Sequence, residues 1–473
     1  MSYRNPKFHR ARAIVKDQDA GSQITVDGDE ACLKFATCVK ADNLFWEVVR
    51  GRLSLSVLLI SVLLNACTQA AGPPSFVEIK GTPGNYQLIR DGAPYQVRGA
   101  GAVPGSLKQL KAFGANSIRT WHVDDALLDE AAALGLTVSV CLDVGRERLG
   151  FDYSDAAAVA AQLARLRSDV TRVKDHPALL TWIIGNELNL NASNPLVWDA
   201  VNDIAKMIHE VDPNHPVTTA LAGFSAKDVS LLKARAPELD FLSTQVYGGI
   251  MGLRQAIETL GITKPIMITE WGTKGHWEVP QTVWGAPIEL SSTKKAEFYL
   301  DGHRKAIASN PGVLIGSYAF LWGQKQERTP TWYGTLSDSG APTEAADALA
   351  KIWTGNWPSN RSPSVDHIRI NGSAATNSVY LEPGSLAEAT VVANDPESEA
   401  LEMRWTLRLE SESEAVGGDR ETLPAMVPDR IVSQSAGQAM IRAPSQTGAY
   451  RLYVEVFDVE GHMGHANFPF YVK

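Results

Sequence analysis

The chain has 473 residues, of which 44% are apolar and 21% charged, so it can bury sizeable cores and is not disordered throughout. Its 53 acidic and 44 basic residues give a net charge of −9, which argues against a nucleic-acid binder with a basic face. At about 100–200 residues per domain, the length predicts two or three domains unless one is a large α/β barrel.

The first notable segment is an apolar run at residues 53–64 (LSLSVLLISVLL), shorter than the roughly 20 residues that span a bilayer. Arg50 and Arg52 precede it and small residues follow, which is typical of a secretory signal rather than of a buried strand. The sequence Leu-Asn-Ala-Cys that ends at Cys67 resembles a bacterial lipobox. The resemblance implies lipidation of Cys67, export, and anchoring in the cell envelope at the outer membrane or the periplasmic face.

These features predict the organisation of the amino-terminal part. We expect a leader without fold, or non-native, at 1–47, a lipoprotein signal peptide at 48–67 and a tether at 68–75. Only Cys141 then remains in the folded body, so neither a disulfide framework nor a metal-binding cysteine set is expected.

Residues 76–354 alternate short apolar segments with amphipathic ones, the pattern of parallel strands covered by helices. A hairpin around Asp91-Gly92 at 86–98 leads into the first strand. The expected strands are 95–99, 115–120, 137–142, 179–184, 216–220, 241–246, 265–269 and 313–321. The expected helices are 107–113, 126–134, 156–174, 195–211, 226–234, 252–260, 294–310 and 342–353. Eight such units predict a (β/α)8 TIM barrel. An open doubly wound sheet is the rival, but no glycine-rich phosphate loop follows the first strand.

Residues 355–364 are rich in Pro, Gly, Ser and Asn and predict a linker. Residues 365–473 follow as an immunoglobulin-like β-sandwich, with strands at 389–393, 401–407, 438–441, 450–458 and 467–472. Two of its phrases, VVANDPESEALEMRWTL and TGAYRLYVEVFDVEG, resemble cadherin-like and polycystic-kidney-disease-like modules. We interpret the acidic residues Asp395, Glu397 and Glu399 as a solvated turn rather than a calcium site, and we expect no metal.

In a TIM barrel the catalytic groups lie at the carboxyl ends of the strands, and two carboxylates occupy such positions here. Glu187 follows the fourth predicted strand and Glu270 the seventh, each directly after a buried run. A carboxylate there is costly unless it is hydrogen-bonded or functional. Facing each other across the barrel mouth, the two can divide the roles of acid and nucleophile. Further polar and aromatic residues at strand ends are Arg119, Trp121, His122, Asp124, Asp143, Asn186, Gln245, Tyr247, Trp271, Trp322 and Gln324.

Four segments of the sequence resemble the barrels of glycoside hydrolase clan A: RDGAPYQVRGAG, LKAFGANSIRTWH, LLTWIIGNELN and ITEWG. The first three are closest to family 2, and the last is equally at home in family 5. The resemblance implies a retaining glycosidase of β-linked poly- or oligosaccharides without a cofactor. Glu187 would be the general acid/base and Glu270 the nucleophile, with their carboxyl groups about 5–5.5 Å apart.

The resemblance also implies roles for neighbouring residues. Asn186 would bind the sugar 2-hydroxyl, Arg119 would keep Glu270 ionised, Tyr247 would donate a hydrogen bond to Glu270, and Trp322 would form the floor of the −1 subsite. We expect His122 to contact the substrate or to support a residue that does. Tryptophans that can stack on sugars in outer subsites are Trp271, Trp277, Trp284 and Trp332.

The chain also departs from both families. It has Gln245-Val246-Tyr247 where family 5 has His-x-Tyr, and its sandwich follows the barrel rather than preceding it as in family 2. Two alternatives remain open: a transglycosylase of the same barrel type, and a non-catalytic carbohydrate-binding envelope lipoprotein. The sugar, the linkage and the oligomeric state are not predicted.

Overall fold

The computed structural model describes residues 14–16, 23–25, 73–102 and 106–473, and the chain divides into the units Met1–Ala70 and Ala71–Lys473. In the first unit, β1 (Ile14–Lys16) pairs with β2 (Gln23–Thr25) in antiparallel fashion, although the sequence predicts no fold there. The apolar run at 53–64 and Cys67 lie outside the described residues, so the signal peptide and the lipid attachment stay predictions. None of the described helices has both the length and the apolar character needed to cross a bilayer.

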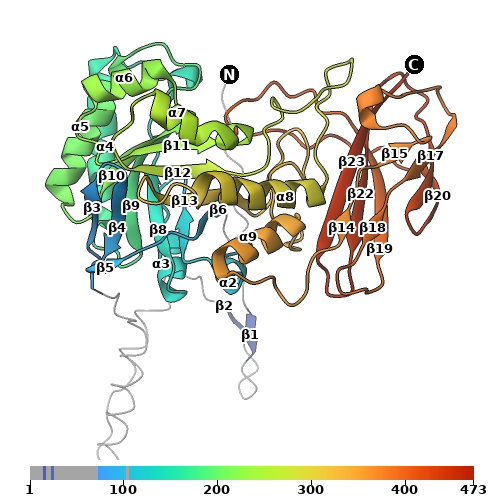
Figure 1. Ribbon diagram of the computed structural model, residues 1–473, viewed down its shortest axis with the longest axis horizontal. Helices are drawn as coiled ribbons and strands as arrows, with labels where there is room; N and C mark the ends of the chain where they lie inside the picture. Colours follow the sequence, from blue (N-terminus) through green and yellow to red (C-terminus); the bar gives the residue numbers. More distant parts are fainter. Residues whose placement is uncertain (1–13, 17–22, 26–72, 103–105) are drawn as a thin grey trace, which may run out of the picture. The chain divides into compact units, whose positions relative to one another are not determined.

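The second unit contains a closed barrel of eight parallel strands surrounded by helices (Figure 1), which confirms the predicted TIM barrel. Its strands are β6 (Gly99–Ala102), β7 (Ser117–Arg119), β8 (Thr137–Leu142), β9 (Leu179–Asn186), β10 (Val217–Ala222), β11 (Leu242–Val246), β12 (Ile266–Trp271) and β13 (Leu314–Trp322). Its helices are α2 (Leu107–Ala112), α3 (Asp125–Ala133), α4 (Ala156–Val173), α5 (Leu196–Val211), α6 (Ala226–Arg235), α7 (Leu253–Thr259), α8 (Ser292–Gly302) and α9 (Glu344–Thr354).

The local sequence explains the form of individual barrel elements. Asp155 caps α4 by accepting hydrogen bonds from the Ala157 and Ala158 backbone N–H groups at 2.9 and 3.1 Å. The strand β9 is buried along its whole length, as expected of a parallel strand with helices on one face and the barrel interior on the other.

The first barrel strand is displaced from its predicted place at 95–99 to Gly99–Ala102. Its sequence, Gly-Ala-Gly-Ala, carries no β-branched or aromatic residue, and so pattern analysis passes over it. The preceding chain forms a separate three-stranded sheet of β3 (Val77–Thr82), β4 (Asn85–Arg90) and β5 (Ala93–Pro94). Asp91 and Gly92 have positive φ angles of 51° and 80°, as the predicted tight turn requires.

The region after the barrel consists of two four-stranded sheets enclosing a core that includes Trp405, Leu452 and Phe468. One sheet contains β15 (Arg369–Ile370), β17 (Leu386–Thr390), β21 (Gln438–Arg442) and β20 (Ile431–Ser435). The other contains β16 (Tyr380–Leu381), β23 (Met463–Val472), β22 (Gly448–Phe457) and β19 (Glu402–Leu409). A short pair, β14 (Ser364–Val365) and β18 (Ala393–Asn394), lies beside them. The predicted sheet-rich C-terminal region is therefore present.

The barrel and the C-terminal sheets are joined through the buried carboxylate of Glu289. It forms an ion pair with Lys295 of α8 and accepts a hydrogen bond of 2.5 Å from the Asn467 amide on β23. Burial by itself raises the pKa of Glu289, but Lys295, His465 and the hydrogen bond from Thr329 together outweigh it, and the net pKa is lowered to about 2. Arg451 of β22 also donates to the Pro287 carbonyl at 2.8 Å. Glu289 and Lys295 both belong to the barrel, so the hydrogen bonds from Asn467 and Arg451 are the contacts here that join the C-terminal sheets to it.

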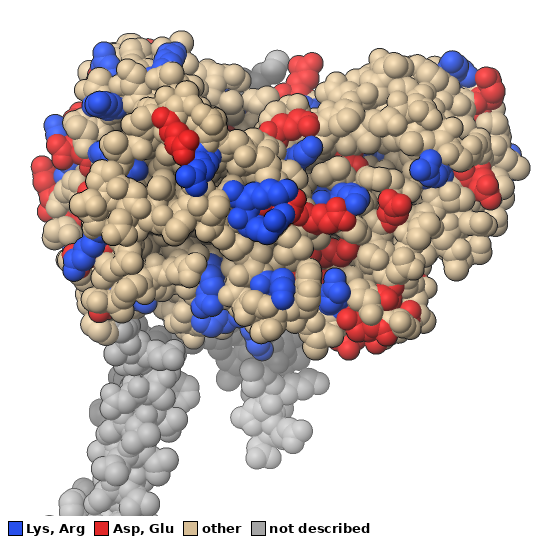
Figure 2. All heavy atoms as spheres, in the orientation of Figure 1, with Lys and Arg blue, Asp and Glu red and all other residues tan. Residues whose placement is uncertain are grey.

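The surface carries charges of both signs. On the face shown in Figure 2, Lys and Arg side chains are interspersed with Asp and Glu side chains. This face offers no extended field of one sign for a polyanion.

Candidate active site

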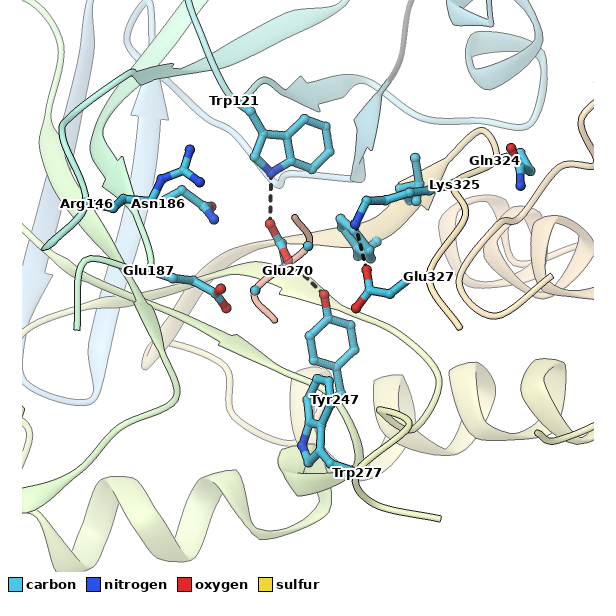
Figure 3. A pocket seen from close by; sticks show the side chains of 14 residues that line it. Trp121, Arg146, Asn186, Glu187, Tyr247, Glu270, Trp277, Gln324, Lys325 and Glu327 are labelled. Atoms are coloured by element: carbon cyan, nitrogen blue, oxygen red, sulfur yellow. Dashed lines mark hydrogen bonds and ion pairs between the residues drawn. The ribbon is translucent and has the colours of Figure 1, made fainter. Parts of the chain in front are cut away.

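A pocket of about 390 Å³ lies at the carboxyl ends of the barrel strands and contains both predicted carboxylates (Figure 3). In Figure 3 the Glu187 carboxyl group is directed toward Glu270. The residues that line the pocket are Trp121, Arg146, Asn186, Glu187, Tyr247, Glu270, Trp277, Phe320, Leu321, Gln324, Lys325, Glu327, Gly417 and Gly418. The folded chain thus brings together residues that are up to 297 positions apart (418 − 121 = 297).

Glu187 comes directly after β9, and its side chain is 9% exposed. Its φ of 52° is uncommon for a residue with a side chain, and such conformations concentrate at functional sites. Burial raises the pKa of Glu187 to about 8, and the negative charge of Glu270 adds to the effect, while Arg119 and Arg148 oppose it. At neutral pH the carboxyl group therefore carries a proton.

Glu270, near the end of β12, is 5% exposed and accepts hydrogen bonds from four side chains. Its Oε1 accepts from Arg119, from Trp121 Nε1 at 3.1 Å and from Gln245 Nε2 at 3.0 Å. Its Oε2 accepts from the Tyr247 hydroxyl at 2.8 Å. All four contacts use the oxygens as acceptors, as an ionised carboxylate does.

Asn186 and Gln245 complete the network around the buried guanidinium of Arg119. The Asn186 amide oxygen accepts from Arg119 and, at 2.6 Å, from Gln245 Nε2. Gln245 lies opposite Glu270 in the register of β11 and β12, which explains how one amide reaches both partners. With its oxygen held in this way, Asn186 has its NH2 group left to offer to a ligand in the pocket.

The aromatic wall of the pocket consists of Trp121, Tyr247, Trp277 and Phe320. Phe320 contacts Trp121 and Tyr247 edge-to-face, with ring centroids 5.8 and 5.9 Å apart. Trp277 contacts Tyr247 at 5.8 Å and is 57% exposed, so part of its ring is available to a ligand. A Cβ atom on Gly101 of β6 would lie 2.6 Å from the Trp121 ring, so glycine leaves the room that Trp121 occupies.

Four predicted substrate-binding residues do not line the pocket. One is Arg119, which is fully buried and reaches the site through its contacts with Glu270 and Asn186. The His122 side chain is 68% exposed on the surface, 3.9 Å from Asp124, because the chain turns outward after Trp121. Trp271 follows Glu270 on the same strand and therefore points to the opposite face, where it is 1% exposed and packs on Tyr299. Trp322 is fully buried, donates to the Ser106 carbonyl at 3.1 Å and does not form a subsite floor.

The other tryptophan candidates are also separated by the structure. Trp277 lines the pocket, whereas Trp332 is 1% exposed in the core. Trp284 packs against Tyr380 and Tyr471 of the C-terminal region, away from the carboxylates.

Sequence reasoning missed several residues of the pocket. Lys325 and Glu327 form an ion pair of 2.7 Å in the loop after β13, and Glu327 is 6% exposed. They follow Trp322, the last residue of β13, by three and five residues, just beyond the strand-end positions predicted from the sequence. Gly417 and Gly418 come from the C-terminal region, and nothing in their local sequence indicates a catalytic pocket.

The acidic residues of the C-terminal region are arranged differently from the prediction. The oxygens of Asp395, Glu399 and Asp458 lie within 4.8 Å of one another, and Glu397 is not part of this group. Asp458 accepts a hydrogen bond of 2.9 Å from Asn360 and one of 2.8 Å from the His462 backbone. These contacts stabilise the turn that follows β22.

The geometry can be compared with known proteins. Residues 103–278 match the family described as "Glycosyl hydrolases family 2, TIM barrel domain", and this range includes Glu187 and Glu270. A relative from Arabidopsis thaliana, named "Putative mannan endo-1,4-beta-mannosidase 4", is 25% identical over 33% of this chain and 41% of its own length. One from Formosa agariphila, named "Putative beta-glucuronidase", is 26% identical over 41% of this chain and 18% of its own length.

Among solved structures, a Bacteroides uniformis beta-glucuronidase is 15% identical, with a TM-score of 0.45 over 84% of this chain and 48% of that chain. The chain covers less than half the length of each of these three relatives. The conclusion that the family match supports is that this chain carries a glycoside hydrolase family 2-like TIM barrel.

Proposed function

We propose that the protein is a retaining glycosidase that hydrolyses β-linked glycosides by double displacement. The observation that carries the proposal is the pairing of two carboxyl groups in one pocket with opposite environments. Glu187 is protonated because burial raises its pKa, whereas Glu270 serves as the acceptor for four donors. Retaining glycosidases need such a pair, one group as acid and the other as nucleophile.

In the first step, Glu270 attacks the anomeric carbon of the sugar while Glu187 gives its proton to the leaving oxygen. Oε1 of Glu270 accepts three hydrogen bonds and Oε2 one, from Tyr247, so Oε2 has the freer lone pair for attack. The bond from the anomeric carbon to the leaving group breaks, and its electron pair stays on the leaving oxygen. The leaving group departs as an alcohol, and the sugar remains as an ester of Glu270.

In the second step, water takes the place of the leaving group. Glu187, now ionised, accepts a proton from that water, whose oxygen attacks the anomeric carbon. The ester bond breaks, and Glu270 returns as a carboxylate to the same four donors. Asn186, through its NH2 group, is placed to bind a sugar hydroxyl beside the reacting carbon.

The sugar can be identified by measuring hydrolysis of a panel of aryl glycosides. The relatives carry the names of a mannosidase and a glucuronidase, so β-mannosides and β-glucuronides belong beside β-glucosides and β-galactosides. The lining of the pocket has mixed charge, with Arg146 and the ion pair of Lys325 and Glu327, and this is compatible with neutral and acidic sugars.

The proposal is tested by trapping the intermediate. A 2-deoxy-2-fluoro glycoside of the preferred sugar should add one glycosyl unit to the protein, on the peptide that contains Glu270. Glu270→Gln should form no adduct and should lose several orders of magnitude in kcat, and Glu187→Ala should regain turnover with azide, which needs no base. An active wild type whose product has the inverted anomeric configuration would overturn the retaining mechanism.

We further propose that the protein is held in the cell envelope by a lipid on Cys67. This rests on the lipobox-like sequence alone. Cys67→Ala should move the full chain from the membrane fraction to the soluble fraction, and an unchanged distribution would contradict the proposal.

A further inference from the structure

The C-terminal region contributes an unusually long loop to the catalytic pocket. The loop connects β19 (Glu402–Leu409) with β20 (Ile431–Ser435), and loops without secondary structure rarely exceed about 12–15 residues unless they serve a function. Its base is fixed on the sheet: the Leu409 N–H donates to the Ala425 carbonyl at 3.0 Å, and the Val427 N–H donates to the Leu407 carbonyl at 2.8 Å. The segment that leaves the sheet is residues 410–424.

The tip of this loop, residues 416–421, binds the barrel at two places. Asp419 binds the guanidinium of Arg148 with both oxygens, and the Nη2 to Oδ1 distance is 3.0 Å. Glu421, which is 8% exposed, accepts a hydrogen bond of 2.7 Å from the Arg328 backbone N–H. A bidentate arginine–carboxylate pair is among the stronger and more directional contacts in proteins. The loop is thus held at its base and near its tip.

The contacts of the tip come from opposite sides of the barrel. Arg148 follows β8, and a Cβ atom on Gly417 would lie 3.0 Å both from Arg148 Nη2 and from Oε2 of Glu187, the residue that follows β9. Lys325 and Arg328 follow β13. In the closed ring, three strands separate β9 from β13 in either direction. A segment that touches both sides lies across the barrel mouth, where substrate enters.

Glycine allows the tip to approach the carboxylate of Glu187. Gly417 and Gly418 both have left-handed backbones, with φ of 59° and 72°. A Cβ atom on Gly417 would lie 3.0 Å from Glu187 Oε2 and 2.6 Å from Leu190 Cδ2. One on Gly418 would lie 3.0 Å from Lys325 Nζ. The loop backbone therefore lies directly against the carboxyl group that donates the proton.

We propose that residues 416–421 form the leaving-group wall of the active site and that Gly417 positions Glu187 for proton transfer. The proposal rests on the proposed function, in which Glu187 protonates the leaving oxygen, so the leaving group must lie on the Glu187 side of the pocket. The C-terminal region then contributes directly to the catalytic site and is not merely an appended module.

The contact between Gly417 and Glu187 also explains why the Glu187 carboxyl group is shielded from water. Backbone against one oxygen excludes water, and burial is the largest cause of the raised pKa of Glu187. A displaced loop would admit water and would lower that pKa toward its usual range.

The experiment uses the full chain with Gly417→Ala and the matched control Gly461→Ala, a left-handed glycine of the same region with open space around it. Two aryl glycosides of the preferred sugar are compared, one with a dinitrophenol leaving group that departs without a proton and one with phenol, which needs it. Gly417→Ala should lower kcat/KM for the phenyl glycoside by about 10-fold or more, part of the 10²–10⁴ of general acid catalysis, and that for the dinitrophenyl glycoside by less than about 3-fold. Gly461→Ala should change neither.

A second pair of variants avoids the strain of a new Cβ atom. Asp419→Asn weakens the anchor on Arg148, and Asp429→Asn is its control at an exposed position of the same region. At acidic pH, where Glu187 carries its proton in either protein, Asp419→Asn should lower kcat/KM for the phenyl glycoside more than for the dinitrophenyl glycoside, whereas Asp429→Asn should change neither. Equal losses on both glycosides with Gly417→Ala or with Asp419→Asn would overturn the role of the loop. Failure of the wild type to cleave any glycoside would instead overturn the proposed function.

Discussion

The pH dependence of turnover tests the assignment of Glu187 as the acid most directly. The proton must be present on Glu187 in the free enzyme, and burial together with Glu270 raises the pKa of this carboxyl group to about 8. With that value, about 90% of the molecules carry the proton at pH 7 and about 10% at pH 9. We therefore expect kcat/KM for a phenyl glycoside to fall about 10-fold between pH 7 and pH 9, and about 10-fold more by pH 10.

The assay is the initial rate at low substrate concentration across pH 5–10, because kcat/KM reports the ionisation of the free enzyme. Glu187→Ala, assayed with a dinitrophenyl glycoside that needs no acid, should lack the alkaline limb. A wild-type profile that stays flat to pH 10, or whose alkaline limb lies near pH 5, would refute the reasoning.

The same shift has a consequence for stability. Because the folded-state pKa is above the unfolded value of 4.5, the stabilising contribution of the proton is complete below pH 4.5 and is lost as pH rises to about 8. Across that range, wild type should lose about 1.4 kcal/mol of unfolding free energy per pH unit relative to Glu187→Gln, which cannot ionise. Urea unfolding of both proteins at pH 5 and pH 7 measures the difference, and parallel values at the two pH values would contradict it.

Three further predictions follow from single contacts. Tyr247→Phe removes the donor 2.8 Å from Glu270 Oε2 and should lower kcat/KM about 10-fold to 100-fold, since hydrogen bonds to charged groups contribute about 1.5–3 kcal/mol; an unchanged value would exclude a role for the hydroxyl. Trp277→Ala, at an exposed ring of the pocket, should raise KM by about 2-fold to 12-fold with kcat retained, and a loss in kcat alone would contradict stacking. Glu289→Gln should cost about 3–5 kcal/mol in unfolding free energy by leaving Lys295 unpaired. Because the pKa of Glu289 is lowered to about 2, its contribution is present above pH 4.5 and is lost as pH falls toward 2, so the variant and the wild type should converge in acid.

Much of the site could be predicted because its residues come directly after apolar strands. Glu187 and Glu270 follow runs that the sequence marks as buried, and the closed ring brings such positions to one end of the barrel. Arg119, Asn186 and Tyr247 also lie at strand ends, and the structure places all three in the hydrogen-bond network of Glu270.

Other predictions from sequence fail for stated physical reasons. Trp271 and Trp322 lie at strand ends too, but side chains alternate between the two faces of a strand, and a tryptophan suits the apolar outer face as well as a sugar-binding floor. Composition and spacing do not tell which face a residue takes at the end of a strand. His122 lies one residue beyond the pocket-lining Trp121, where the chain has already turned to solvent.

Hydrophobic periodicity and strand-end position are local properties of the chain, and they were enough to predict the barrel, its eight repeating units and the two carboxylates. The contact of Gly417 with Glu187 and the pairing of Asp419 with Arg148 become visible only in the folded chain. Those contacts join residues more than 200 positions apart, through a loop that starts at Glu410, which binds Arg451, and Arg451 in turn binds the Pro287 carbonyl of the barrel. Such a path is set by the packing of whole domains.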